Sequence, residues 1–221
     1  LLVLSYYRHR DSAVPLPEPL EDAACPVVLV QLPVYNERFV VERILEATVA
    51  LDWPRDRLRV QLLDDSTDDT TECAQRAVAR HRAAGTDIQL VRREHRKGFK
   101  AGALQEGLTL DASGRTAAPF VAIFDADFIP NPDFLRRALR PLVEDPSLGM
   151  AQGRWAHLNR SRNLLTRAQA ILLDGHFVME HGSRFRAGHF FNFNGTAGVW
   201  RRQAIEDAGG WQGDTLTEDL D

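Results

Sequence analysis

The sequence predicts an α/β fold with a mainly parallel central sheet flanked by helices. Short apolar runs, rich in β-branched residues, alternate with segments of helical periodicity from residue 27 onward. This alternation is typical of β-α-β units, in which a helix connects two parallel strands. The first run, at 27–32, is almost continuously apolar, as expected for a strand covered on both faces.

The individual elements follow from the same patterns. The predicted strands are 27–32, 58–63, 88–91 and 120–124, and the helices between them are 37–51, 68–81 and 99–110. Asn131 and Pro132 predict a further helix start, with the asparagine as cap and the proline at the first helical position. Beyond residue 148 the pattern is less regular: we expect a helix over 163–179 and a short helix over 201–208, closed by two glycines.

Composition excludes several classes of protein. The chain has 221 residues and a formal net charge of −4, with 27 basic and 31 acidic side chains. It therefore has no bulk positive field of the kind expected for a generic nucleic-acid binder. Cys25 and Cys73 allow at most one disulfide bridge and lack metal-ligand spacing, so we expect two reduced thiols.

The first residues have a distinctive order. Residues 1–10 pass from apolar residues through two tyrosines to basic residues, which is how the cytoplasmic end of a transmembrane helix looks. A frayed terminus or an added strand is the alternative. No run of 18 apolar residues is present. Residues 11–26 are rich in proline and acid and predict a linker.

Acidic residues follow the predicted strands directly. Asp125 and Asp127 come just after the strand at 120–124, and Asp64 and Asp65 come just after the strand at 58–63. Ligands in parallel sheets bind beyond the carboxyl ends of the strands, and carboxylate oxygens are what Mg²⁺ or Mn²⁺ prefers. The first pair therefore predicts a divalent cation site, with a solvated turn as the alternative. One of the second pair is expected to accept hydrogen bonds from a base or ribose, while this loop also caps the next helix.

A basic segment follows the third strand. Residues 92–102 contain five basic side chains and one acidic side chain, and they lead into a predicted helix. Helix N-termini favour phosphate, and lysine adds charge. Because the acidic loops are expected nearby, we interpret this segment as a diphosphate site. The alternative is a solvated basic turn. Asp219 is a candidate general base, which could remove a proton from an acceptor hydroxyl.

Five ordered motifs and one longer segment together resemble the processive family 2 glycosyltransferases, the cellulose-synthase-like enzymes with a GT-A fold. The motifs are Pro33-Val34-Tyr35-Asn36-Glu37, Asp64-Asp65-Ser66, Lys97-Gly98-Phe99-Lys100-Ala101-Gly102, Asp125-Ala126-Asp127 and Thr217-Glu218-Asp219. The segment 190–201 is similar to the acceptor-side segment of the glucomannan and mannan synthase-like branch. The resemblance covers about residues 26–221.

The resemblance implies a role for each matching residue. The nucleotide base and ribose would be contacted by Tyr35, Glu37 and Asp65, and the diphosphate by Lys100 with help from Lys97. Asp125 and Asp127 would hold Mg²⁺ or Mn²⁺ and the sugar diphosphate. Asp219 would be the catalytic base, and the preceding residue, Glu218, would bind substrate. The acceptor end would be shaped by Phe191, Asn194 and Gly195.

The implied protein is a metal-dependent, inverting enzyme that transfers a hexose from GDP-mannose or UDP-glucose to a growing β-linked polysaccharide. Residues 1–25 are then expected to be a membrane-helix stub and linker, and 26–221 a GT-A catalytic domain on the cytoplasmic side of a membrane, cut before the family's Q-x-x-R-W motif. A non-processive transferase acting on a lipid phosphate and a nucleotide-sugar-binding module without turnover remain alternatives. No nucleic-acid partner is expected.

Overall fold

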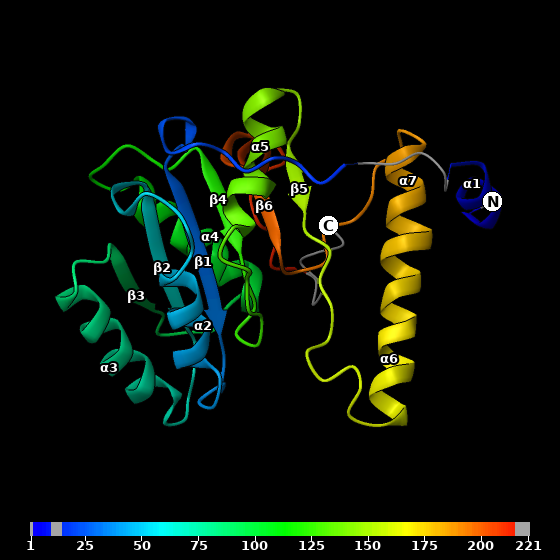
Figure 1. Ribbon diagram of the computed structural model, residues 1–221. Coiled ribbons are helices and arrows are strands. Elements are labelled where there is room, and N and C mark those ends of the chain that lie inside the picture. The colour runs from blue at the N-terminus through cyan, green and yellow to red at the C-terminus, as the bar shows by residue number, and fades with distance from the viewer. Residues whose placement is uncertain (1, 10–14, 215–221) are drawn as a thin grey trace. The chain divides into compact units, whose positions relative to one another are not determined.

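The computed structural model describes residues 2–9 and 15–214 and confirms the α/β fold with a mainly parallel sheet (Figure 1). Six strands form one sheet in the order β3-β2-β1-β4-β6-β5. The strands are β1 (Val28–Val34), β2 (Leu58–Asp64), β3 (Ile88–Arg92), β4 (Phe120–Ile123), β5 (Met150–Gln152) and β6 (Gly198–Arg201). The first four are mutually parallel, and β6 pairs antiparallel with both β4 and β5.

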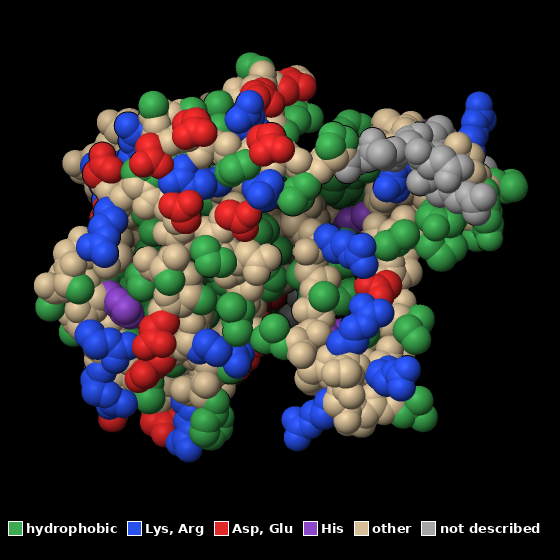
Figure 2. Space-filling view, viewed as in Figure 1, with side chains coloured by type: hydrophobic (Ala, Val, Ile, Leu, Met, Phe, Trp, Pro, Cys, Tyr) green, Lys and Arg blue, Asp and Glu red, His purple; other side chains and the backbone are tan. Residues whose placement is uncertain are grey.

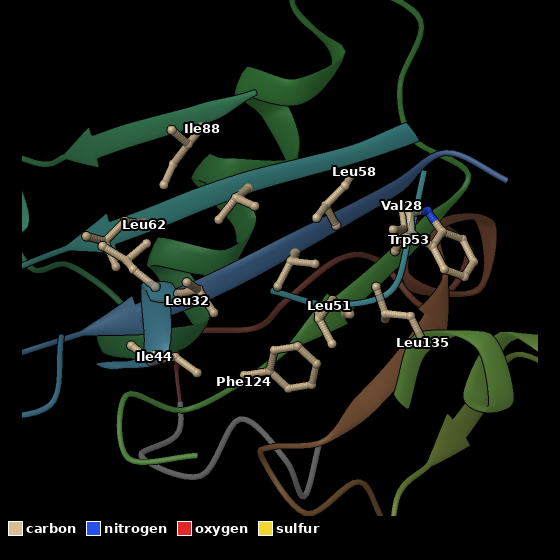
Figure 3. Packing of buried hydrophobic residues seen from close by; sticks show 14 of the residues in the cluster. Val28, Leu32, Ile44, Leu51, Trp53, Leu58, Leu62, Ile88, Phe124 and Leu135 are labelled. Atoms are coloured by element: carbon tan, nitrogen blue, oxygen red, sulfur yellow. The ribbon is translucent and has the colours of Figure 1, made fainter. Parts of the chain in front are cut away.

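Helices cover both faces of the sheet. They are α2 (Val41–Val49), α3 (Thr70–Ala83) and α5 (Phe134–Glu144) on one face, and α4 (Phe99–Ala112) on the other. Alternate residues of β1 point to opposite faces, as the period of a strand requires. Val28, Val30 and Leu32 enter the apolar cluster with α2, α3 and α5, whereas Gln31 faces α4. Figure 3 shows this cluster, in which Ile44 and Leu135 meet the strands from two of the helices.

The face under α4 contains a buried polar ladder. Gln31 Nε2 donates to Gln61 Oε1 at 3.1 Å and to the carbonyl of Leu104, while Gln61 Nε2 donates to the carbonyl of Gly107 at 2.9 Å. A Cβ at Gly107 would lie 2.4 Å from Gln31 Nε2 and 2.6 Å from Gln61 Oε1. Glycine at this position therefore lets α4 approach the sheet closely enough for both glutamines to find partners.

Several boundaries differ from those predicted. Helix α2 begins at Val41 rather than Glu37, because residues 35–40 form the loop after β1. Helix α5 begins at Phe134 with Asp133 at the cap position, so the prediction that Asn131 caps it was wrong. Strands β5 and β6 were not predicted, because each is short and pairs with a partner distant in sequence. The short helix predicted at 201–208 is α8 (Arg202–Asp207), followed by Gly209 and Gly210 with positive φ.

The described residues divide into two compact units. Residues 17–152 and 194–214 form the unit that contains the sheet. On its visible face, basic and acidic side chains are intermixed (Figure 2), as the nearly balanced composition suggests. Part of the segment predicted to be a linker packs here: Leu20 and Cys25 are buried, and Arg136 donates to the carbonyl of Leu20 at 2.6 Å. Both cysteines are free thiols.

The other unit is helical and comprises residues 2–9, 15–16 and 153–193. It contains α1 (Leu2–His9), α6 (Leu164–Gly175), a π-helical segment His176–His181 and α7 (Gly182–Arg186). The predicted helix start at Asn163 is confirmed. The Asn163 side chain accepts from the backbone N–H of Thr166, and Thr166 Oγ1 accepts from the backbone N–H of Asn163, which forms a capping box. Among the residues that the structure describes, no helix is long and apolar enough to cross a membrane.

A buried ion-pair cluster lies at the amino end of β4. The fully buried carboxylate of Asp111 accepts from Arg202 Nη2 at 2.6 Å, from Arg59 Nη1 at 3.0 Å and from the amide of Ala118 at 2.8 Å. Arg115 Nη2 lies 3.2 Å from the same carboxylate. Asp111 thus holds α4 and the start of α8 to the entry of the strand.

We predict that Asp111→Ala lowers the free energy of unfolding by about 3–5 kcal/mol, because it leaves the buried guanidinium of Arg202 without its carboxylate. The measurement is urea denaturation followed by circular dichroism. Asp87→Ala is the matched control, since Asp87 also pairs with Arg115 but is half exposed; its expected cost is about 1 kcal/mol or less. Equal losses in the two variants would contradict the assigned role of Asp111.

Candidate functional site

The carboxyl ends of three parallel strands meet at one edge of the sheet. Strand β1 runs in register with β2, so that Val34 lies opposite Asp64, and its other neighbour β4 runs in the same direction. The loops that follow these strands therefore begin at the same edge, and these are the loops that carry most of the sequence-predicted donor and metal residues.

The loops after β1 and β2 are cross-linked by hydrogen bonds. Asn36 has φ of 58°, and its backbone N–H donates to Ser66 Oγ at 2.9 Å. Its side-chain oxygen accepts from the backbone N–H of Thr67 at 2.9 Å. Asp64 is fully buried and accepts from the Ser66 amide at 3.0 Å and from Arg92 Nη1 at 2.8 Å. Asp64 therefore shapes this loop from within the protein.

Asp65 has a buried partner that the sequence analysis did not identify. Arg93 donates Nε to Asp65 Oδ1 at 2.9 Å and Nη2 to Oδ2, and both side chains are only 7% exposed. The same guanidinium donates to the carbonyls of Lys97 and Phe99, each at 2.8 Å. Asp65, predicted to contact a nucleotide, is thus also one half of an ion pair that anchors the turn before α4.

Lys100, Asp125 and Gly195 are brought together although they are distant in sequence. Lys100 Nζ lies 2.7 Å from Asp125 Oδ1 and donates to the Gly195 carbonyl at 2.8 Å. The Asp125 amide donates to Thr196 Oγ1 at 2.9 Å, which holds the start of the loop after β4. A predicted diphosphate-binding cation and a predicted metal ligand therefore face each other at this edge.

Negative charge is concentrated near these residues. Local desolvation raises the pKa of the Glu37 carboxyl, and the nearby charges of Asp127 and Asp125 raise it further, although Glu37 and Asp127 are exposed as whole residues. Carboxylates that repel one another in this way fit a divalent cation, whose charge would relieve the repulsion. Among the described residues, no group of three or more potential ligands is already assembled for a metal.

Aromatic side chains flank the basic segment. The guanidinium carbon of Arg96 lies 3.6 Å from the centre of the Tyr35 ring and 5.1 Å from that of Phe99. Tyr35 is 40% exposed and Phe99 is 44% exposed, and the neighbouring Lys97 is exposed as well. An exposed ring at the end of β1 offers a surface on which a planar base can stack.

The predicted acceptor residues fall in different parts of the chain. In the sheet-containing unit, the backbone N–H of Asn194 donates to Gln152 Oε1 at 3.1 Å. Phe191 belongs to the helical unit, where its ring packs against His181 with centroids 5.2 Å apart. Glu218 and Asp219 lie outside the described residues.

Two contributors were missed from sequence, Arg93 and Thr196. Arg93 could not be singled out among the basic residues of its segment, because its contact depends on strand register: β2 and β3 pair with Asp64 opposite Arg92, and the residues that follow the two strands, Asp65 and Arg93, then meet. Thr196 could not be singled out either, because its contact with Asp125 depends on the antiparallel pairing of β6 with β4.

Comparison with known proteins gives a consistent result. A family model described as "Glycosyltransferase like family 2" matches residues 26–221. The chain is 45% identical over 216 residues to glucomannan 4-beta-mannosyltransferase 1 of Oryza sativa subsp. japonica, covering 97% of this chain and 41% of the relative. It is 46% identical over 205 residues to glucomannan 4-beta-mannosyltransferase 2 of Arabidopsis thaliana, covering 92% and 38%. The chain thus spans about two fifths of the length of these relatives.

A solved structure has a similar fold. The mannosyltransferase from Pyrobaculum calidifontis, in complex with GDP-Man and Mn²⁺, superposes with a TM-score of 0.74 at 26% identity, covering 99% of this chain and 57% of that one. Its similarity confirms the predicted GT-A fold. The family model matches most of the length of this chain, and the chain therefore belongs to glycosyltransferase family 2.

Proposed function

We propose that the protein transfers a mannosyl unit from GDP-mannose to the growing end of a β-linked polysaccharide. The observation that carries this proposal is the meeting of Lys100 with Asp125 at the edge where Glu37 and Asp127 also lie. Cationic and anionic groups side by side suit a sugar diphosphate bound with a divalent cation. The choice of mannose rests on the relatives, which are named glucomannan 4-beta-mannosyltransferases, and on the neighbour bound to GDP-Man and Mn²⁺.

The proposal assigns the residues at this edge of the sheet to different parts of the donor. Tyr35 stacks with the base, with Glu37 close to the ribose. Asp125 and Asp127 would hold Mg²⁺ or Mn²⁺, which when bound supplies Lewis-acid stabilisation of the leaving diphosphate. The ammonium of Lys100 is partly exposed and can contact phosphate oxygens from the N-terminal turn of α4, where the helix dipole also favours negative charge.

The chemical step needs one base. Asp219 accepts the proton of the acceptor hydroxyl as that oxygen attacks the anomeric carbon, on the side opposite the departing nucleoside diphosphate. Attack from that side inverts the configuration at the anomeric carbon. Gly195 accepts a hydrogen bond from Lys100 in the proposed donor region, and Asn194 and Gly195 would contribute to the acceptor end. Phe191 is proposed as an acceptor-side residue as well. In the whole protein we place this domain on the cytoplasmic side of a membrane.

The proposed activity is tested by supplying the whole protein, in membranes, with radiolabelled GDP-mannose or UDP-glucose and digesting the polymer with linkage-specific glycanases. We expect label from GDP-mannose to enter β-linked mannan or glucomannan. Incorporation from UDP-glucose alone would overturn the choice of donor. Label recovered only in a lipid phosphate, or nucleotide binding without any product, would overturn polysaccharide synthesis.

The proposed metal role predicts that Asp127→Asn weakens Mn²⁺-dependent GDP binding by about tenfold or more, because one anionic ligand of the cation is lost. Isothermal titration calorimetry of the chain with GDP, with and without Mn²⁺, measures the effect. Asp87→Asn, an exposed carboxylate that pairs with Arg115, is the matched control and should bind like the unaltered chain. Unchanged affinity in Asp127→Asn would remove Asp127 from the metal site.

The proposed base predicts that Asp219→Asn lowers the transfer rate of the whole protein by about 10²–10⁴-fold, because the amide cannot accept the hydroxyl proton. GDP binding should stay close to that of the unaltered protein, since the base contacts the acceptor. The measurements are product formation at saturating donor and GDP titration in parallel. Transfer at a comparable rate would show that another group is the base.

A further inference from the structure

We infer that Arg93 is a positioning residue for donor binding: it holds Asp65 and the turn from Lys97 to Phe99 in the arrangement from which the neighbouring side chains contact a nucleoside diphosphate. The inference rests on the proposed function, in which Lys100 binds the diphosphate.

Arg93 uses its guanidinium in two directions at once. Nε and Nη2 form a fork on the two oxygens of Asp65, and Nη1 and Nη2 also donate to the carbonyls of Lys97 and Phe99 at 2.8 Å each. The ion pair is nearly completely buried, with 7% of each side chain exposed. One planar group therefore ties the loop after β2 to the turn that begins α4.

The turn that Arg93 holds has a conformation that side chains rarely adopt. Gly98 and Phe99 have φ of 69° and 46°, so two successive residues lie in the left-handed region. Glycine adopts this conformation freely, but a bulky residue such as phenylalanine does so only when its surroundings require it. The carbonyls of Lys97 and Phe99, on either side of Gly98, are the two that Arg93 binds.

The next residue along the chain is Lys100, whose ammonium reaches Asp125 and Gly195. A change in the preceding turn would move the first turn of α4 and with it this ammonium. Gly102 belongs to the same arrangement, because a Cβ there would lie 2.6 Å from Arg93 Nη1 and 2.1 Å from the Lys97 carbonyl oxygen. The glycine of the Lys100-Ala101-Gly102 motif thus leaves the space that the guanidinium occupies.

The substitution Arg93→Lys separates the effect of the planar guanidinium geometry from the effect of its positive charge. The lysine ammonium keeps the positive charge, but it cannot present the planar fork to Asp65 while also donating to two carbonyls. Arg202→Lys is a matched control, since Arg202 is also a buried arginine, 8% exposed, paired with the carboxylate of Asp111. That pair lies at the amino end of β4, the opposite end of the strand from Asp125.

The experiment is calorimetric titration of the chain and its variants with GDP in the presence of Mn²⁺, together with thermal unfolding of each variant. We expect Arg93→Lys to weaken GDP binding by about tenfold or more, and Arg202→Lys to bind within about twofold of the unaltered chain. Asp65→Asn should reproduce the loss, and the double variant should lose little more than either single variant, because both break one pair. In the whole protein, Arg93→Lys should raise KM for the donor with kcat nearly unchanged.

GDP binding by Arg93→Lys within about twofold of the unaltered chain would overturn the inference and leave the proposed function intact. Loss of the cooperative unfolding transition in Arg93→Lys, with that of Arg202→Lys retained, would also overturn it, because Arg93 would then stabilise the fold as a whole. If the unaltered chain binds neither GDP nor UDP with Mn²⁺, the proposed function fails and the inference falls with it.

Discussion

The parallel pairing of β1 with β2 on one side and β4 on the other is the constraint on which the rest of the site depends. Parallel strands all end at the same edge of a sheet. Because β1 lies between its two partners, the loops carrying Glu37, Asp65 and Asp125 begin beside one another. A strand running in the opposite direction would carry its carboxylate to the other edge of the sheet, and another strand order would separate the three loops along the same edge.

Helix α4 adds the cationic side of the site, and polar contacts hold it along its whole length. At its start, Arg93 binds the turn before Lys100. In its middle, the carbonyl of Gly107 accepts from Gln61, and near its end Asp111 accepts from Arg202. The opposite face of the sheet relies instead on apolar packing (Figure 3). Hydrogen bonds are directional, so on this face they fix both the position of α4 along the strands and its distance from the sheet.

Much of the fold could be predicted because its signals are local. Strand β2 and helix α4 begin at the predicted residues and extend only one and two residues further than expected, since apolar periodicity and the flanking residues act within each segment. The start of α5 was misplaced because Asn131 and Pro132 form a local helix-start pattern, whereas the helix begins two residues later, after Asp133, whose side chain makes no capping hydrogen bond. Strands β5 and β6 lack the short, fully apolar run that identifies β4, because β5 is Met150-Ala151-Gln152 and β6 is Gly198-Val199-Trp200-Arg201.

The order of the elements and the kinds of side chain at the strand ends can be read from the sequence, and its motifs indicate the family. These properties are carried by neighbouring residues and by residue type. Which side chains meet follows from the folded chain: Asp65 faces Arg93, Lys100 faces Asp125 and Thr196 holds the loop after β4. All three contacts join residues that are distant in the chain, and all three depend on strand register and helix placement, which the packing of the whole sheet sets.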